Sequence, residues 1–297
     1  MSLPLAILFC VITMLGWGSW ANTQKLAGKE KWPFELFYWD YAIGVFLFSL
    51  LFATLGGRFA MGPGMVPALI SGAIFNLANI LLVVSIDAAG MSVAFPVGIG
   101  LALVIGTVES YLETPKGNPS LLFAGVALIV FAMIMSAASR QTVGKNRIRG
   151  LLYSIVAGCI MGLFYPQLMR AIGPDKLTPY VALVFFGAGV LASNVAVNTV
   201  FMKAGHVTYA DYFRGTAKLH SIGVLGGCIW MLALCLNVIA ANVAGPAISY
   251  ALGQGATLVA AIWGVFVWRE KGTMSYTILM FIGYATGLIL IGAATLH

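Results

Sequence analysis

Long runs of apolar residues follow one another along the chain, separated by short polar breaks. A run of about 18 or more apolar residues is long enough to cross a hydrocarbon core of roughly 30 Å as an α-helix. The pattern therefore predicts an all-α integral membrane fold with ten transmembrane helices. We place these spans at 3–24, 34–55, 66–86, 90–111, 120–138, 150–171, 179–202, 219–242, 246–268 and 273–294.

The composition agrees with a membrane protein, since 61% of the 297 residues are hydrophobic and only 8% are charged. The four cysteines all fall inside predicted spans, where they pack as small apolar residues and indicate neither a disulfide framework nor a metal site. The net charge of +7 comes from basic residues in loops, so it reports membrane topology and not nucleic-acid binding.

The basic residues divide the loops into two classes. Those after spans one, three, five, seven and nine carry most of the lysines and arginines, and cytoplasmic loops collect such residues. We therefore expect a multi-pass protein of the cytoplasmic (inner) membrane with both termini outside. The residues on the expected inner side are Lys25, Lys29, Lys31, Arg140, Lys145, Arg147, Arg149, Lys203, Arg214, Lys218, Arg269 and Lys271, against Arg58, Lys116, Arg170 and Lys176 outside.

The sequence repeats itself. A shift of 155 positions sets "GMSVAFPVGIGLALV" (90–104) on "GPAISYALGQGATLV" (245–259), and a shift of 145 sets "WANTQKLAG" (20–28) on "YPQLMRAIG" (165–173). Because each half holds five spans, the two halves enter the membrane from opposite sides. We expect an inverted repeat, with a first five-helix repeat over 1–138, a basic cytoplasmic connector over 139–149 and a second repeat over 150–297. Such halves exchange conformations in alternating-access transporters, so transport is the leading hypothesis.

Aromatic residues near the end of span one indicate a solute-stacking surface. Trp17 and Trp20 share a helical face with Gln24, and Trp17 is too deep for an interfacial anchor; helix packing is the alternative. The second register adds Asn22, which falls on Gln167, and sets Trp20 on Tyr165.

Amides inside the spans must face the interior of the bundle, because an unsatisfied amide in hydrocarbon is costly. They either contact a solute or hold helices together. Tyr250 and Gln254 form a polar stripe on span nine, whereas their repeat partners are Phe95 and Ile99; such asymmetry suits a binding cavity. The amides are Asn76 and Asn79 in span three, Asn194 and Asn198 in span seven, and Gln254.

Acidic residues in the spans are candidates for coupling transport to protons. Asp40 lies near the start of span two, where a carboxylate needs a partner, water or a proton. We expect Asp40 to carry the coupling proton, with Glu109 as the competing site and a structural hydrogen bond as the alternative role. Glu35 is expected to be an acidic residue at the N-terminus of a helix.

Motifs for ATP-driven transport or hydrolysis are not evident, since the sequence has no phosphate loop, no paired His or Cys at metal-binding spacing and no Ser/His/Asp grouping. The three histidines, His206, His220 and His297, fall in a loop, at a span edge and at the terminus. We expect no enzyme and no cofactor, with H⁺ as the favoured coupling ion and Na⁺ as the alternative. The expected partners are a small-molecule solute and the lipid bilayer, without nucleic acid, in a monomer or homodimer.

The motifs "GWGSWANTQKL", "FYWDY" and "GAIFNLANILL…DAAGMSVAFPVGIGLALVIGTVESYLE" resemble the drug/metabolite transporter superfamily, and more narrowly the ureide permeases and glucose/ribose porters. The resemblance implies proton-coupled uptake of a small neutral solute, either a ureide or nucleobase-like heterocycle or a sugar, and points to Trp17, Trp20, Asp40, Asn76 and Asn79. The short central loop favours a bacterial relative over the plant permeases. Two alternatives remain: an exporter of the same superfamily, and a membrane scaffold or sensor without flux.

Overall fold

The structure is a computed structural model that describes residues 1–29, 31–56, 59–89, 91–139, 146–269 and 272–296, and within those ranges it is helical without a β-strand. Most of the predicted connector, at 140–145, and the loop cations Arg58 and Lys271 lie outside the described residues. The helices are α1 (Leu3–Ser19), α2 (Ala21–Lys29), α3 (Phe34–Ala53), α4 (Met65–Ala89), α5 (Met91–Glu113), α6 (Pro119–Ser139), α7 (Arg147–Arg170), α8 (Pro179–Ala204), α9 (Tyr209–Phe213), α10 (Ala217–Ala244), α11 (Pro246–Gly253), α12 (Ala256–Ile262) and α13 (Met274–Ala293).

Nine helical segments of the described part are long and apolar enough to cross a membrane. The prediction of an all-helical, multi-pass membrane fold is therefore confirmed. The remaining predicted span, the fourth at 90–111, coincides with α5, whose first side chains lie outside the described residues. The nine segments are Leu3–Gly28, Phe34–Gly56, Met65–Ser85, Pro119–Ser139, Ile148–Arg170, Pro179–Ala204, Ala217–Ala244, Pro246–Val267 and Met274–Leu296.

The chain folds into two compact units, each of which takes segments from both halves of the sequence. The first, which we call the α6–α13 unit, consists of Met1–Gly18, Ala78–Pro166 and Leu236–His297. The second, the α3–α8 unit, consists of Ser19–Leu77 and Gln167–Cys235. Each boundary between them falls inside a helix, namely α1, α4, α7 and α10.

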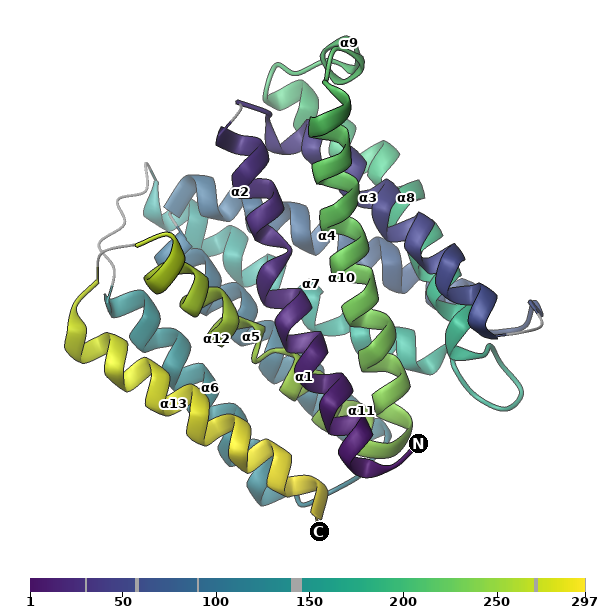
Figure 1. The fold of residues 1–297 in the computed structure, drawn as a ribbon, viewed down its shortest axis with the longest axis vertical. Helices are drawn as coiled ribbons and strands as arrows, with labels where there is room; N and C mark the ends of the chain where they lie inside the picture. The colour runs from purple at the N-terminus through teal and green to yellow at the C-terminus, as the bar shows by residue number, and fades with distance from the viewer. Residues whose placement is uncertain (30, 57–58, 90, 140–145, 270–271, 297) are drawn as a thin grey trace. The chain divides into compact units, whose positions relative to one another are not determined.

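Small residues let helices approach closely inside each unit. In the α6–α13 unit these two helices run side by side (Figure 1). A Cβ atom at Gly125 of α6 would lie only 2.6 Å from the carbonyl oxygen of Gly287 of α13, so both positions need glycine. In the α3–α8 unit, Gly227 of α10 lies against the backbone of Tyr41 and Val45 of α3 in the same way. Close backbone contact of this kind is how helices associate in lipid.

Alanine at Gly227 is expected to destabilise the α3–α8 unit by about 1–3 kcal/mol, because its Cβ would overlap the Tyr41 carbonyl oxygen and force α3 and α10 apart. Gly28 of α2 is a matched control with open space around it, and Gly28→Ala should be neutral or slightly stabilising. Thermal unfolding of the two purified variants measures the difference. Equal midpoints would contradict the packing described for α3 and α10.

Two predicted spans differ from a continuous helix. The first span extends to Lys29, beyond the predicted end at 24, and is interrupted at Trp20 between α1 and α2. The ninth span is broken at Gln254–Gly255, between α11 and α12, and ends in a π-helical turn over Trp263–Val267. Gly253 and Gly255 flank Gln254, and glycine is a poor residue for a helix interior. The helical stripe predicted for Tyr250 and Gln254 is thus cut at Gln254 itself.

Candidate functional site

Buried polar side chains gather around the break in the ninth span, within the α6–α13 unit. The hydroxyls of Tyr165 (α7) and Ser249 (α11) are 2.9 Å apart. Because Ser249 Oγ donates its hydrogen to the Pro246 carbonyl at 3.1 Å, Tyr165 is the donor to Ser249. Asn237 of α10 donates from Nδ2 to the Ser249 carbonyl at 2.8 Å. We call Trp17, Tyr165, Asn237, Ser249, Tyr250 and Gln254 the helix-break cluster.

Aromatic rings form one side of the helix-break cluster. The rings of Tyr165 and Tyr250 stack at 4.8 Å between centroids, and the Tyr250 hydroxyl donates to the Ala102 carbonyl of α5 at 3.3 Å. Trp17 of α1 reaches Gly253, where an added Cβ would lie 2.8 Å from its Cζ3 atom and 2.9 Å from Asn237 Nδ2. The predicted residues Trp17, Tyr165, Tyr250 and Gln254 are therefore brought to one place, and all are buried.

Hydrogen bonding in the helix-break cluster is incomplete. The Oδ1 atom of Asn237 is buried and has no hydrogen-bond partner among the described residues. Gln254 is 9% exposed and occupies the C-cap position directly after α11, where the regular helical hydrogen bonding stops. A buried acceptor without a partner costs on the order of 1–3 kcal/mol, so this arrangement favours an occupant that donates hydrogen bonds.

A second constellation lies within the α3–α8 unit, around Asp40 of α3. This carboxylate is 2% exposed and accepts a hydrogen bond of 2.7 Å from the Tyr212 hydroxyl of α9. The Nδ1 atom of His220, at the start of α10, lies 2.9 Å from Oδ1 and 3.0 Å from Oδ2 of the same carboxylate. Gly223 makes room for Asp40, since any side chain at 223 would overlap its Cβ. Asp40, Tyr212 and His220 form what we call the carboxylate cluster.

The short helix α9 holds Tyr212 in place. Its N-terminus is closed by a capping box, in which Thr208 and Asp211 exchange hydrogen bonds. Those hydrogen bonds, from the Thr208 hydroxyl first and its backbone N–H second, lower the pKa of Asp211. Burial, together with the hydrogen bond to Asp40 and its charge, raises the pKa of Tyr212 above its ordinary value. Tyr212 thus keeps its proton at neutral pH and donates to Asp40.

An aromatic layer continues from Trp20 across the α3–α8 unit. Trp20 packs on Tyr41 at 4.8 Å between ring centroids, and Trp230 packs on Phe75 at 4.1 Å. The hydroxyl of Tyr41 is buried without a hydrogen-bond partner among the described residues. Trp20 is half-buried, so one part of its surface is used for packing inside this unit.

The predicted amides have different environments. Asn198 of α8 donates from Nδ2 to the Glu35 carbonyl at 2.8 Å and joins α8 to α3, which is the helix-packing role. Asn76 and Asn194 are fully buried, and neither amide atom of either residue has a hydrogen-bond partner among the described residues. Asn79 is buried on α4 in the α6–α13 unit and makes interactions of its own.

The remaining predicted site residues are engaged locally. Asn22 donates from Nδ2 to the Ser19 carbonyl at 2.9 Å. Gln167 accepts from Arg170 at 3.1 Å. Glu109 is half-buried on α5 and also has an interaction partner. In the described ranges, no three His, Cys, Asp or Glu side chains gather where they could bind one metal ion.

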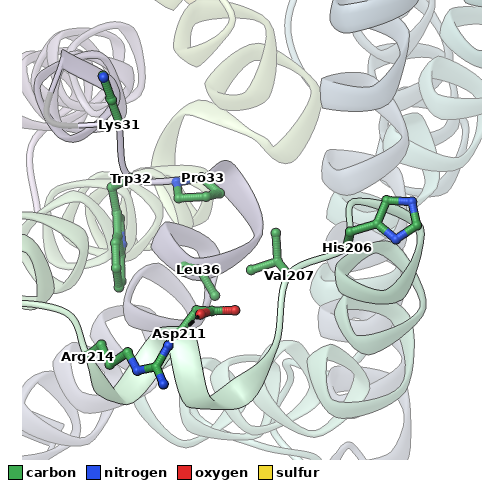
Figure 2. A pocket seen from close by; sticks show the side chains of 8 residues that line it. All are labelled: Lys31, Trp32, Pro33, Leu36, His206, Val207, Asp211 and Arg214. Atoms are coloured by element: carbon green, nitrogen blue, oxygen red, sulfur yellow. Dashed lines mark ion pairs between the residues drawn. The ribbon is translucent and has the colours of Figure 1, made fainter.

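A surface pocket of about 300 Å³ lies beside α9 in the α3–α8 unit (Figure 2). Its lining combines apolar and charged side chains, and Asp211 and Arg214 form an ion pair of 3.5 Å there. Trp32 lines it and also meets the His220 ring edge-on, at 5.6 Å between centroids. The lining residues are Lys31, Trp32, Pro33, Leu36, His206, Val207, Asp211 and Arg214.

Four site residues were not predicted from the sequence: Asn237, Ser249, Tyr212 and His220. Asn237 is an amide inside the span 219–242, so the criterion applied to the other amides would have found it. Tyr212 and His220 lie 172 and 180 positions from Asp40, and no sequence spacing links them to it.

Comparison with known proteins places the chain among sugar transporters. The profile of the family described as "Sugar transport protein" matches residues 8–297. The chain is 24% identical to the "Putative ribose uptake protein RbsU" of Lactobacillus johnsonii, with 98% of each chain covered. It is also 24% identical to a "Putative sugar uptake protein" of Enterococcus faecalis, over 97% of this chain and 99% of the other.

A crystal structure whose description states no activity superposes with a TM-score of 0.70 at 15% identity, covering 96% of this chain and 95% of its own, and this likeness concerns the fold alone. The wider link to the drug/metabolite transporters and ureide permeases stays a prediction. The family match extends over nearly the whole sequence, from within α1 to beyond the end of α13. The chain belongs to the sugar transport protein family.

Proposed function

We propose that this protein imports a monosaccharide such as ribose or a hexose across the cytoplasmic membrane, together with a proton. The observation that carries the proposal is the helix-break cluster, because a broken span surrounded by buried, incompletely hydrogen-bonded groups is typical of a transporter's solute site. The names of the relatives support a sugar as the solute. Among neutral solutes, a heterocycle of the ureide or nucleobase type is the competing substrate class.

The chemistry of the helix-break cluster suits a sugar. Each sugar hydroxyl can both donate and accept hydrogen bonds. A sugar can therefore donate to Asn237 Oδ1, which lacks a partner among the described residues, and also form hydrogen bonds with the Gln254 amide. The aromatic side chains Trp17 and Tyr250 supply apolar surface for the C–H groups of the ring. None of these groups is charged, which favours a neutral solute over an ionic one.

Alternating access is the mechanism we propose. In this proposal α5 also crosses the membrane, which brings the nine candidate spans of the described part to ten. The repeats would be 1–138 and 150–297, joined by the connector at 139–149, and both termini would lie outside. Support comes from the length of α5, 23 residues, and from the break in the ninth span near the repeat motif. One monomer of ten spans suffices for the pathway.

Asp40 is the proposed coupling group. A carboxylate inside a membrane span costs at least a few kcal/mol when ionised and alone, whereas Asp40 has two partners that stabilise its charged form. The alternation of Asp40 between these bonded and protonated states would tie the proton to the transport cycle. Glu109, half-buried on α5, is the weaker candidate.

Counterflow in proteoliposomes tests the proposed substrate class. Vesicles loaded with unlabelled ribose or glucose are expected to take up the labelled sugar transiently, and an excess of the neutral sugar should compete. Allantoin and uracil should compete poorly, as should charged drugs. Exchange of the heterocycles without exchange of either sugar would overturn the sugar assignment, and the absence of any exchange would favour a scaffold or sensor.

Leucine at Asn194 separates a transport role from a packing role, with Asn198 one turn away as its matched control. Asn194→Leu removes no hydrogen bond within the described protein, so stability should hold while sugar exchange falls. Asn198→Leu removes the bond to Glu35 and should lower the free energy of unfolding by about 1 kcal/mol. Thermal unfolding and counterflow are measured on both. Normal exchange with lowered stability in Asn194→Leu would show that Asn194 packs helices.

A further inference from the structure

The carboxylate cluster contains a residue that reaches the protein surface, unlike the buried acid. Asp40 is 2% exposed, whereas the His220 side chain that touches it is 27% exposed. The hydroxyl of Tyr212 closes a further side of the carboxylate by donating to Oδ1. A proton that reaches or leaves Asp40 along these described contacts therefore passes either a phenol, which keeps its own proton, or the imidazole.

We propose that His220 is the proton relay of the transporter, through which the coupling proton moves between Asp40 and water on the side of the membrane where α9 lies. This inference rests on the proposed role of Asp40 as the coupling group. His220 is a relay and positioning residue, and it does not contact the sugar.

The geometry allows a balanced transfer. With Asp40 protonated, its O–H donates to the lone pair on His220 Nδ1, and transfer of that proton leaves a carboxylate and an imidazolium. Loss of the Nε2 proton to water then gives the neutral Nδ1–H tautomer, which donates to the carboxylate at the observed 2.9–3.0 Å. One proton leaves in total, and the reverse order loads one. Histidine suits this role because its two ring nitrogens can take up a proton on one edge of the ring and release one from the other.

The surroundings hold the imidazole in this position. Tyr212 meets it edge-on at 4.7 Å and Trp32 at 5.6 Å between ring centroids, and Gly215 leaves room beside its Nε2 atom. Asp40 and Tyr212 are the titratable groups that contact the imidazole in the described part of the chain. The other charged side chains on the surrounding elements are Lys31, Glu35, Asp211, Arg214 and Lys218.

The first variant to test is His220→Asn, measured in proteoliposomes against His206→Asn. Asparagine keeps a donor close to the position of Nδ1 but does not titrate. We expect uptake driven by a pH gradient to fall about 100-fold or more in His220→Asn, since a positioned proton-transfer group typically contributes about 10²- to 10⁴-fold. Sugar counterflow, which needs no net proton movement, should stay within about twofold of wild type. His206 also belongs to the α3–α8 unit and lines the surface pocket, so His206→Asn should change neither activity.

Chemical rescue provides a readout that a purely structural histidine would not give. In His220→Ala, imidazole in the buffer should restore proton-driven uptake in a concentration-dependent way, while the protein without imidazole shows counterflow alone. Wild-type proton-driven rates in His220→Asn would overturn the relay, as would an unrescued His220→Ala that retains counterflow. Failure of the proposed function can be told apart from failure of the relay. If proton-coupled import through Asp40 were wrong, the wild-type protein would show no proton-driven uptake, or Asp40→Asn would retain that uptake.

Discussion

Replacing Asp40 with asparagine is expected to abolish the accumulation of sugar driven by a pH gradient while leaving sugar exchange in place. Asparagine has nearly the same shape and still accepts a hydrogen bond from Tyr212, so the α3–α8 unit should remain folded. It carries no titratable proton, and a transporter without its coupling group equilibrates its solute without concentrating it. In proteoliposomes, we expect at least a tenfold loss of the steady-state accumulation ratio, since one pH unit is worth about 1.4 kcal/mol per coupled proton.

Asp211→Asn is the matched control for Asp40→Asn. Asp211 is also an acid of the α3–α8 unit, but it lies outside the membrane spans and serves the capping box of α9. Its replacement should leave proton-driven accumulation intact. If Asp40→Asn kept proton-driven accumulation and Glu109→Gln lost it, the coupling group would be Glu109 on α5 and not Asp40.

Leucine at Gln254 is expected to remove sugar binding. The substitution keeps the size of the side chain and removes the amide at the break between α11 and α12, where Asn237 Oδ1 already lacks a partner. Loss of one or two hydrogen bonds to a buried sugar costs about 1–3 kcal/mol, or roughly 10- to 100-fold in kcat/KM for counterflow. Rates measured over a range of sugar concentrations should show this mainly as a raised KM.

Thr257→Val is the matched control for Gln254→Leu. The Thr257 hydroxyl bonds back to the Gln254 carbonyl at 3.0 Å within the chain, so its loss should change local helix geometry slightly and leave sugar affinity near wild type. If Thr257→Val and Gln254→Leu had the same small effect, the helix break would be structural and the sugar site would lie elsewhere.

The sequence predicts the fold in its main features because hydrophobicity over a span of lipid thickness is a strong constraint. Local interruptions inside a span are harder to predict. The span at 246–268 is apolar enough on average to be predicted as one helix, so its mean hydropathy does not indicate the break. Gly253 and Gly255 beside Gln254 do indicate a weak point in the helix. The same applies to Trp20, where the first span is interrupted between α1 and α2.

For the candidate site, the sequence predicts which residues are buried but not which residues they contact. Burial of Asp40 and of the amides follows from their places in apolar spans, and the structure agrees on their burial. The partners that give these residues their roles come from distant segments. His220 reads in the sequence as a histidine at a span edge, and only the packing of α10 against α3 at Gly223 and Gly227 brings it to Asp40.

Accumulation of a labelled monosaccharide by wild-type protein in sealed liposomes, under an imposed inward proton gradient, tests the central claim most directly. The account predicts uptake of ribose or glucose well above equilibrium, up to about 100-fold for a gradient of two pH units and one proton per sugar, with complete collapse on adding a protonophore. Sugar that only equilibrates across the membrane, at a level indifferent to the gradient and to the protonophore, would contradict proton-coupled import.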